Sequence, residues 1–474
     1  MDEMKKPNIL FLLIDSFRAD KCYGKNKTSI TPNLDSLIKQ GTYFSQAISS
    51  APVSIPSMSS VLTARFPFKA VMSSGNRFKL NSRIPTSVYY LKNLGYNTIA
   101  LTPEILSLSG LTNDFTNNFT YPRHDGLNED VGDQILNVFE SEDLKEPWFF
   151  YIHLLDIHGT ARGFPEKFNQ EEYGMNQYER MVSSIDIWFG RILKKIKLEK
   201  TIIVLTADHG NDAGIYTLEM EERKKFVYKD DLQSVFNVGK KISSKLPKSL
   251  SPLKSKIRKI YLNNKNKAKT KKKREKLEES KQQNLSPYMK RILEHSINLS
   301  YTVFDDRFRV PLLFAGFGIQ SNLIINQQVR SIDIFPTILE LINTTYENMV
   351  DGKSLLPLIN GQSYKEIPAY MESTANWTKS KKTTDVVGIR YQGFKYFRSR
   401  NNSKEKIGLY NLLDDPLEEI NLVKKMPEKV VKMEKLLSEI RKDAPEEFEK
   451  EPEDQKDLEE NRRAEEELKK LGYL

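Results

Sequence analysis

The stretch PNILFLLID, residues 7–15, decides the fold class of this chain. Its run from Ile9 to Ile14 is apolar at every position, is far too short to cross a bilayer, and stops on Asp15. A strand with one face in water alternates apolar and polar residues, whereas a strand covered on both faces does not. We therefore predict a strand from Asn8 to Ile14 in the interior of a sheet, with a carboxylate at its end.

The same pattern recurs along the chain. Four further β-rich runs follow, which are Asn97 to Leu101, Trp148 to Leu154, Thr201 to Thr206 and Pro311 to Ala315. Between the runs lie helical patterns such as TPNLDSLIKQG (31–41) and IPTSVYYLKNLG (84–95), with Thr or Pro at the start and Gly at the end. This alternation predicts an α/β fold with a mostly parallel sheet sandwiched by helices, which binds ligands beyond the carboxyl ends of its strands.

The composition is that of a globular protein without a disulfide framework. The 474 residues are 39% hydrophobic and 29% charged, and Cys22 is the sole cysteine. No apolar run is long enough for a transmembrane helix, and the opening MDEMKKPN lacks the apolar core of a secretory signal. We therefore expect a cytoplasmic protein with no transmembrane segment. Retention by a partner at the inner membrane surface is the alternative.

Acidic residues and histidines gather where the predicted strands end. Three of the five histidines fall in or directly after these strands. The residues concerned are Asp15, His153, Asp156, His158, Asp208 and His209. A single such residue is usually a helix cap or a loop residue, but the carboxyl ends of parallel strands converge on one edge of the sheet. Carboxylates and imidazoles together predict a site for a divalent metal, which is Zn²⁺, Mn²⁺, Ca²⁺ or Mg²⁺.

Ser54, in the stretch APVSIPSMSSVLTARFP (51–67), has two interpretations. Because Pro56 follows it near the first turn of a predicted helix, Ser54 is a candidate N-cap. A serine at a helix N-terminus also lies near free backbone N–H groups and the positive end of the macrodipole, which bind anionic oxygens. Beside a metal, its hydroxyl would ionise and act as a nucleophile on an anionic ester.

The order of these segments resembles the alkaline-phosphatase-like superfamily, and specifically its sulfatase branch. PNILFLLIDSFRADKCYG is similar to the opening strand, residues 31–67 to the nucleophile segment, WFFYIHLLDIHG to a strand that delivers an active-site histidine, and TADHGND to a second pair of metal ligands. The later landmarks follow in the same order, namely FDDRFRVPLLFAGFGI, SIDIFPTILELI, DGKSLLPLI and GLYNLLDDPLEEINLV. The resemblance implies the α/β fold with a smaller C-terminal α+β subdomain.

The resemblance also implies roles for the candidate residues. Asp15, Asp208 and His209 would hold a divalent metal, and Ser54 would be the nucleophile that also touches it. His158 would contact the transferred group or protonate the leaving oxygen. The remaining candidates would bind a second metal or contact the substrate, and they are His153, Asp156 and His295.

Three departures from the sulfatase pattern bear on the chemistry. Members that oxidise the nucleophile to formylglycine have an arginine four positions after it, and here that position is Met58, which offers no guanidinium to an anion. Ser16 replaces the second aspartate of the usual pair, and LTPEILSLSG (101–110) lacks the usual lysine. The chain thus resembles the members that keep an unmodified Ser or Thr as nucleophile.

These observations predict a metal-dependent hydrolase of sulfate or phosphate esters. A serine on a metal is the machinery of phosphoryl transfer, and a serine-sulfate intermediate would be hard to resolve without formylglycine, so a phosphoester is preferred. One alternative is an ordinary sulfuric ester hydrolase of the arylsulfatase type. The other is a degenerate member that binds polyanions without turnover.

The predicted domain organisation has four parts. A catalytic domain covers residues 1–342 and contains a basic, partly disordered insertion at 222–291, a C-terminal subdomain covers 343–442, and a charged helical tail covers 443–474. Glu221 to Arg291 carries a net charge of +16 and the whole chain +10, so the remainder is −6.

The basic insertion has two interpretations. Lys240 to Arg274 contains 15 basic residues and no acidic one, a composition typical of a solvated loop. The alternative is a tether for an anionic polymer or a membrane surface beside the active site. Nucleic acid is a poorer candidate, because this segment offers only Tyr261 for base stacking.

Overall fold

The computed structural model describes residues 6–74, 77–122, 125–142, 144–158, 165–211, 288, 303–344, 350–373, 385–445, 448–449 and 459. The predicted insertion at 222–291 lies outside these residues except for position 288, and the predicted tail at 443–474 lies mostly outside them. Within the described ranges, no helix is both long enough and apolar enough to cross a membrane.

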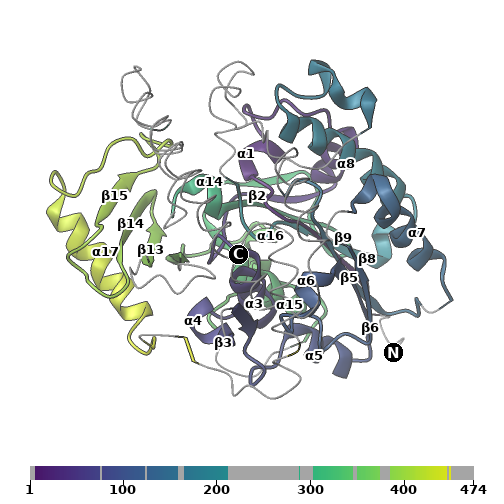
Figure 1. Cartoon of the computed structure of the whole chain (residues 1–474), viewed down its shortest axis with the longest axis horizontal. Coiled ribbons are helices and arrows are strands. Elements are labelled where there is room, and N and C mark those ends of the chain that lie inside the picture. The colour runs from purple at the N-terminus through teal and green to yellow at the C-terminus, as the bar shows by residue number, and fades with distance from the viewer. Residues whose placement is uncertain are drawn as a thin grey trace, which may run out of the picture. The chain divides into compact units, whose positions relative to one another are not determined.

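A nine-stranded sheet forms the centre of the fold (Figure 1). Strand β1 (Asn8–Ile14) pairs in parallel with β7 (Trp148–Leu154) on one side and with β8 (Thr201–Thr206) on the other. Every residue of these three strands is buried, as their continuous apolar sequences predicted, and all three predicted ranges are confirmed. Because the strands are parallel, their carboxyl ends share one edge of the sheet.

The sheet extends in both directions from β1. On the side of β7 it continues with β5 (Asn97–Pro103) and β6 (Asn117–Tyr121), which are parallel to their neighbours. On the side of β8 it continues with β9 (Arg309–Gly316), β2 (Gly41–Ile48), β10 (Leu323–Ile325) and β11 (Val329–Arg330).

Strand β9 departs from the expected direction. It covers the predicted run from Pro311 to Ala315 but pairs antiparallel with both β8 and β2, so the sheet is mixed. A continuous apolar run indicates that both faces of a strand are buried. It does not indicate whether the strand is parallel or antiparallel to its neighbours. The prediction of a mostly parallel sheet therefore holds, with one antiparallel strand inside it.

Helices cover the sheet in two groups (Figure 1). The first contains α2 (Pro32–Lys39), α7 (Gly132–Glu140) and α8 (Gln177–Leu193), and the second α3 (Ser54–Thr63), α5 (Ser87–Asn93) and α15 (Ile334–Leu341). The patterns at 31–41 and 84–95 correspond to α2 and α5. Pro32 is the first residue of α2, and the Thr86 hydroxyl caps α5 by accepting from Tyr89 N–H.

Shorter elements connect these layers. They are α1 (Ala19–Cys22), α4 (Pro67–Ala70), β3 (Val71–Ser74), β4 (Arg77–Leu80), α6 (Glu104–Ser107), η1 (Leu127–Val131), η2 (Glu166–Asn169), η3 (Glu171–Tyr173), η4 (Leu198–Lys200), α14 (Asp305–Phe308), η6 (Ser331–Asp333) and α16 (Leu356–Ile359).

A second, antiparallel sheet follows in the C-terminal part. Its order is β12 (Ala369–Ser373), β13 (Val386–Tyr391), β14 (Phe394–Ser399) and β15 (Gly408–Asn411), and α17 (Pro427–Ile440) contacts β13 and β14. Gln392 and Gly393 both have positive φ, which is the backbone of a two-residue hairpin between β13 and β14. The α+β character expected for this part is confirmed.

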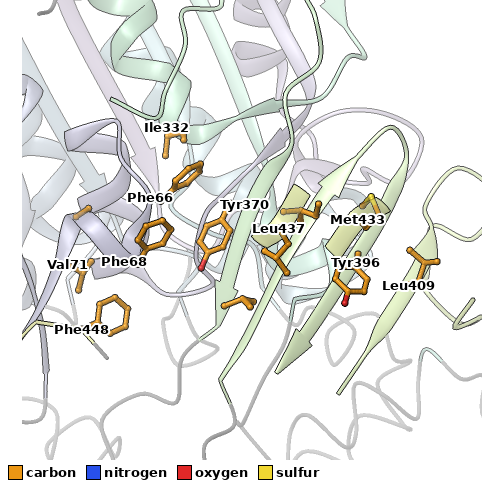
Figure 2. Close-up of a cluster of buried hydrophobic side chains, with 13 residues drawn as sticks. Phe66, Phe68, Val71, Ile332, Tyr370, Tyr396, Leu409, Met433, Leu437 and Phe448 are labelled. Atoms are coloured by element: carbon orange, nitrogen blue, oxygen red, sulfur yellow. The ribbon is translucent and has the colours of Figure 1, made fainter. Parts of the chain in front are cut away.

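An aromatic cluster joins the C-terminal sheet to the helical layer (Figure 2). Phe66 and Phe68 lie against Tyr370 of β12, with ring centroids 5.2 and 5.4 Å from the Tyr370 ring. Met433 and Leu437 of α17 belong to the same cluster, together with Tyr396 and Leu409 of the sheet. Edge-to-face aromatic pairs of this kind add about 0.5–1.5 kcal/mol each beyond the burial of their area.

Candidate metal centre and nucleophile

Asp15 is fixed at the end of β1 by its backbone and by the next residue. Its N–H donates to Leu154 O of β7 at 2.8 Å, and its side chain is buried. Ser16 has a φ of 64°, a left-handed backbone that a serine adopts at a cost. In that conformation the Ser16 hydroxyl donates to Asp15 Oδ1 at 2.6 Å and its N–H donates to Asp208 Oδ1 at 3.1 Å. The turn after β1 therefore holds two carboxylates side by side.

Asp208 and His209 follow β8 at the same edge. Asp208 Oδ1 also accepts from His209 N–H at 2.7 Å, whereas Asp208 Oδ2 is buried and accepts no hydrogen bond from the described residues. His209 Nδ1 lies 2.7 Å from Gly210 O. Because a carbonyl can only accept, Nδ1 carries a proton, and Nε2, which lies 3.4 Å from Asp208 Oδ2, is the nitrogen that could coordinate a metal.

Asp15, Asp208 and His209 together fit a metal ion. One possible ligand atom from each lies within 4.8 Å of the other two, and all three side chains are buried. Two carboxylates and one imidazole are ligands that suit Zn²⁺ and Mn²⁺, and the carboxylates also suit Ca²⁺ and Mg²⁺. The buried Asp208 Oδ2, which accepts no hydrogen bond in the described structure, is the atom that a cation would satisfy.

The electrostatics of the two carboxylates point the same way. Burial, and after it the neighbouring charge of Asp15, raise the pKa of Asp208 to about 7. Burial would also raise the pKa of Asp15, but the charge of His158 and contacts with His153 and His209 outweigh it and hold that pKa well below its ordinary value. Near neutral pH Asp15 thus stays charged whereas Asp208 is partly protonated, and a bound cation would favour the charged form of both.

Ser54 is not the N-cap of its helix. Val53 occupies the cap position with an extended backbone and makes no side-chain cap, and Ser54 is the first residue of α3. The Ser54 hydroxyl donates instead to Asp15 Oδ2 at 3.0 Å. The hydroxyl therefore faces the candidate metal ligands from the N-terminal end of a helix, where backbone N–H groups favour anionic oxygens.

Two serines that sequence reasoning did not identify fasten α3 to the metal-ligand loop. The hydroxyls of Ser49 and Ser57 donate to Asp208 O at 2.6 and 2.5 Å, and both side chains are buried. Ser57 lies three residues after Ser54, on the same face of α3, and this spacing is the one signal in the sequence that pointed to it.

The two histidines of the β7 segment lie on opposite oxygens of Asp15. His153 is fully buried, with Nε2 3.5 Å from Asp15 Oδ2. His158 Nε2 is 3.9 Å from Asp15 Oδ1, and its side chain is 22% exposed. His158 is therefore the histidine of this pair that solvent and a substrate can reach.

Asp156 is not in the group of three candidate metal ligands. Asp156 accepts from Leu127 N–H at 2.9 Å and lies against Gly126, so it holds the start of the η1 turn. His295 lies outside the described residues. Met58 is fully buried within α3.

Two family models match the chain. The model described as Sulfatase matches residues 7–344, and the one described as N-sulphoglucosamine sulphohydrolase, C-terminal, matches residues 294–443. Arylsulfatase K of Xenopus laevis is 27% identical over 155 residues, which cover 31% of this chain and 28% of that protein. Steryl-sulfatase of Homo sapiens is 30% identical over 145 residues, which cover 28% of this chain and 24% of that protein. The chain thus matches less than a third of the length of these relatives.

Solved structures share the fold over nearly the whole chain. A phosphonate monoester hydrolase of Agrobacterium radiobacter has a TM-score of 0.65 at 15% identity, covering 93% of this chain and 96% of its own. BT1596, a 2-O GAG sulfatase, has a TM-score of 0.62 at 17% identity, covering 93% of both chains. At such identities the likeness shows the fold alone, whereas the sulfatase model spans well over half of the sequence. The chain therefore belongs to the sulfatase family of the alkaline-phosphatase-like superfamily.

Proposed function

We propose that this protein is a metal-dependent hydrolase of anionic esters in which Ser54 is the nucleophile. The observation that carries the proposal is the 3.0 Å hydrogen bond from Ser54 Oγ to Asp15 Oδ2, an oxygen of the candidate metal group. This hydrogen bond places a hydroxyl at the N-terminus of a helix directly beside a set of candidate metal ligands.

Asp15, Asp208 and His209 would hold the divalent metal, which is Ca²⁺, Mn²⁺, Zn²⁺ or Mg²⁺. When bound, the cation supplies positive charge that lowers the pKa of the serine hydroxyl and neutralises the oxygens of the transferred group. Ser54 Oγ forms the bond to phosphorus or sulfur as the bond to the leaving oxygen breaks. His158, the more exposed histidine, is placed to contact the transferred group or to protonate that leaving oxygen.

We prefer a phosphate ester over a sulfate ester. Met58 supplies no guanidinium to the transferred group and removes the arginine that formylglycine formation requires. An unmodified serine can pass through a phosphoseryl intermediate that water hydrolyses. The similarity of the fold to a phosphonate monoester hydrolase is compatible with this preference.

The second candidate function is an ordinary sulfuric ester hydrolase. It is favoured by the matches to Arylsulfatase K and steryl-sulfatase, which are sulfatases by name. A degenerate member without turnover is disfavoured, because Asp15, Ser54, Asp208 and His209 remain in mutual contact.

Purified protein, loaded in turn with Mn²⁺, Zn²⁺, Ca²⁺ and Mg²⁺, should be offered an aryl phosphate, a diaryl phosphodiester and an aryl sulfate. We expect metal-dependent release of the phenol from a phosphoester, and none from Ser54→Ala. Turnover of the aryl sulfate alone would favour the second function. Absence of turnover and of bound metal would leave only the degenerate member.

We also propose that the basic insertion at 222–291 brings the enzyme to an anionic polymer or an anionic membrane surface. The proposal rests on its net charge and on its position in the sequence, directly after Asp208 and His209. Each well-placed cation near an anionic lipid surface contributes about 1 kcal/mol.

A further inference from the structure

A chain of buried polar groups leads from the interior of the sheet to the nucleophile. Tyr151 and His153 alternate on β7 and therefore point to the same face. The Tyr151 hydroxyl lies 2.8 Å from His153 Nδ1, and His153 Nε2 lies 3.5 Å from Asp15 Oδ2. Asp15 Oδ2 is also the oxygen that accepts from Ser54. The mechanism proposed above uses neither Tyr151 nor His153.

The surroundings of Tyr151 fix where the proton of His153 resides. The phenol ring lies between Phe11 and Phe115, with centroids 5.6 and 5.8 Å away. Burial raises the pKa of Tyr151 well above its ordinary value, so the hydroxyl keeps its hydrogen. In the described part of the chain His153 Nδ1 is the one hydrogen-bond partner of that hydroxyl. A buried O–H needs an acceptor, and Nδ1 can accept only when it is unprotonated.

An acceptor at Nδ1 leaves the ring hydrogen on Nε2, the buried nitrogen that lies 3.5 Å from Asp15 Oδ2 and makes no hydrogen bond with the described residues. The backbone of His153 is held as well, because its carbonyl accepts from the Tyr121 hydroxyl at 2.5 Å. The ring therefore has little freedom to turn away from the carboxylate.

We propose that His153 is a positioning residue that sets the rotation of the Asp15 carboxylate for metal binding and for Ser54, and that Tyr151 sets the tautomer of His153. Ser16 donates to one oxygen of Asp15 and Ser54 to the other, and the unbonded His153 Nε2 lies 3.5 Å from the oxygen that Ser54 contacts. Groups that orient metal ligands in this way typically change metal affinity about 10- to 100-fold when they are removed.

The inference rests on the proposed metal site, and the first measurement separates the two because it needs no metal. The chain has five histidines, so ¹⁵N-histidine labelling gives a spectrum with few signals, and His153→Gln identifies the one of interest. In metal-free protein we expect His153 to show an unprotonated Nδ1 and a protonated Nε2. A proton on Nδ1, in the other tautomer or in an imidazolium, would overturn the proposal.

The second measurement is the Mn²⁺ dissociation constant by competition with a chelator. His153→Leu should weaken Mn²⁺ binding about 10- to 100-fold, and His153→Gln, which keeps an N–H near the position of Nε2, should restore most of it. Tyr151→Phe should weaken binding to a smaller degree. Tyr96→Phe is the matched control, because it removes a buried phenol hydroxyl that donates to Pro7 O at 3.0 Å, outside the candidate metal group.

A purely structural role predicts a different pattern. Tyr151→Phe and Tyr96→Phe would then lower the thermal midpoint of the metal-free protein alike, and neither would alter Mn²⁺ affinity. Equal Mn²⁺ affinity in wild type and His153→Leu would overturn the proposal, whether or not the protein turns over an ester.

Discussion

The hydroxyl of Ser57 donates a 2.5 Å hydrogen bond to the carbonyl oxygen of Asp208. This contact joins the helix that carries Ser54 to the loop that carries two candidate metal ligands, and Ser49 makes a parallel contact at 2.6 Å. Because Asp208 is buried, its carbonyl needs hydrogen-bond partners from the protein, and these two hydroxyls fix the position of Asp208 relative to Ser54.

Ser57→Ala should therefore reduce kcat more than it reduces stability. Loss of one buried hydrogen bond lowers the free energy of unfolding by about 1 kcal/mol. Displacement of the Ser54 hydroxyl from its position beside the metal ligands would in addition lower kcat. Denaturant unfolding and steady-state kinetics measure the two effects. Ser60→Ala is the matched control, because the Ser60 hydroxyl is equally buried on α3 but donates to Pro56 O of its own helix. Equal loss of activity in both variants would contradict the role given to Ser57.

Asp208→Asn should abolish high-affinity metal binding and activity together while the fold persists. The amide keeps the shape of the side chain, so Asp208 Oδ1 contacts with Ser16 and His209 can be retained in part, but the negative charge is lost. Metal content by elemental analysis and circular dichroism provide the readouts. Glu129→Gln is a control, since Glu129 accepts from Gly126 N–H outside the metal group. Unchanged metal content in Asp208→Asn would remove Asp208 from the ligand set.

Metal affinity should depend on pH through Asp208. Its pKa is raised to about 7 in the metal-free protein by burial and by Asp15, and a cation binds the ionised form. Mn²⁺ affinity should therefore fall about tenfold for each pH unit below 7. An affinity that is flat between pH 5 and 7, a range set by that shift, would contradict the assignment.

The same shift has a consequence for stability. Between pH 3.8, the ordinary pKa of an aspartate, and about pH 7, the folded protein binds a proton on Asp208 and the unfolded chain does not. The contribution of this group to stability is therefore present at low pH and is lost as the pH rises through 7. Added metal should offset this loss, and thermal unfolding with and without Mn²⁺ at several pH values measures it.

Sequence reasoning reached the architecture because the decisive strands are buried on both faces. The ranges of β1, β7 and β8 were predicted to the residue from uninterrupted apolar runs. The direction of β9 was not, since an apolar run is the same for parallel and antiparallel pairing. Asp15, Asp208 and His209 were chosen because they follow those strands, and the structure brings all three together.

Other features of the site depend on contacts that no local pattern encodes. Ser16 stands where the sulfatase pattern has an aspartate, and only the structure shows that its left-handed backbone turns its N–H toward Asp208. The local sequence around Ser54 favours an N-cap, but its hydroxyl donates to Asp15, which lies 39 residues earlier in the chain. The sequence predicts Asp156 as a metal or substrate contact, and the structure adds that its Oδ1 accepts from Leu127 N–H at the start of η1.

Deletion of Lys240 to Arg274 should separate catalysis from localisation. Turnover of a small aryl ester should be nearly unchanged, while binding to vesicles that contain anionic lipid, or to a soluble polyanion, should weaken. Binding by the full chain should also fall steeply between low and physiological salt, because the attraction is screened. A variant with the same number of serines in place of this segment controls for length. Failure of the full chain to bind either partner at low salt would mean that the insertion is a spacer.

The central claim is that unmodified Ser54 attacks the ester, and one measurement tests it most directly. Metal-loaded protein is mixed with an aryl phosphate, quenched in acid and digested, and the peptide containing residues 51–67 is analysed by mass spectrometry. We predict that serine is present at position 54 before the reaction, and that a phosphoryl group appears on Ser54 during turnover and is absent from Ser54→Ala. Formylglycine at residue 54, or a turnover-dependent phosphoryl group on any other residue, would contradict the account.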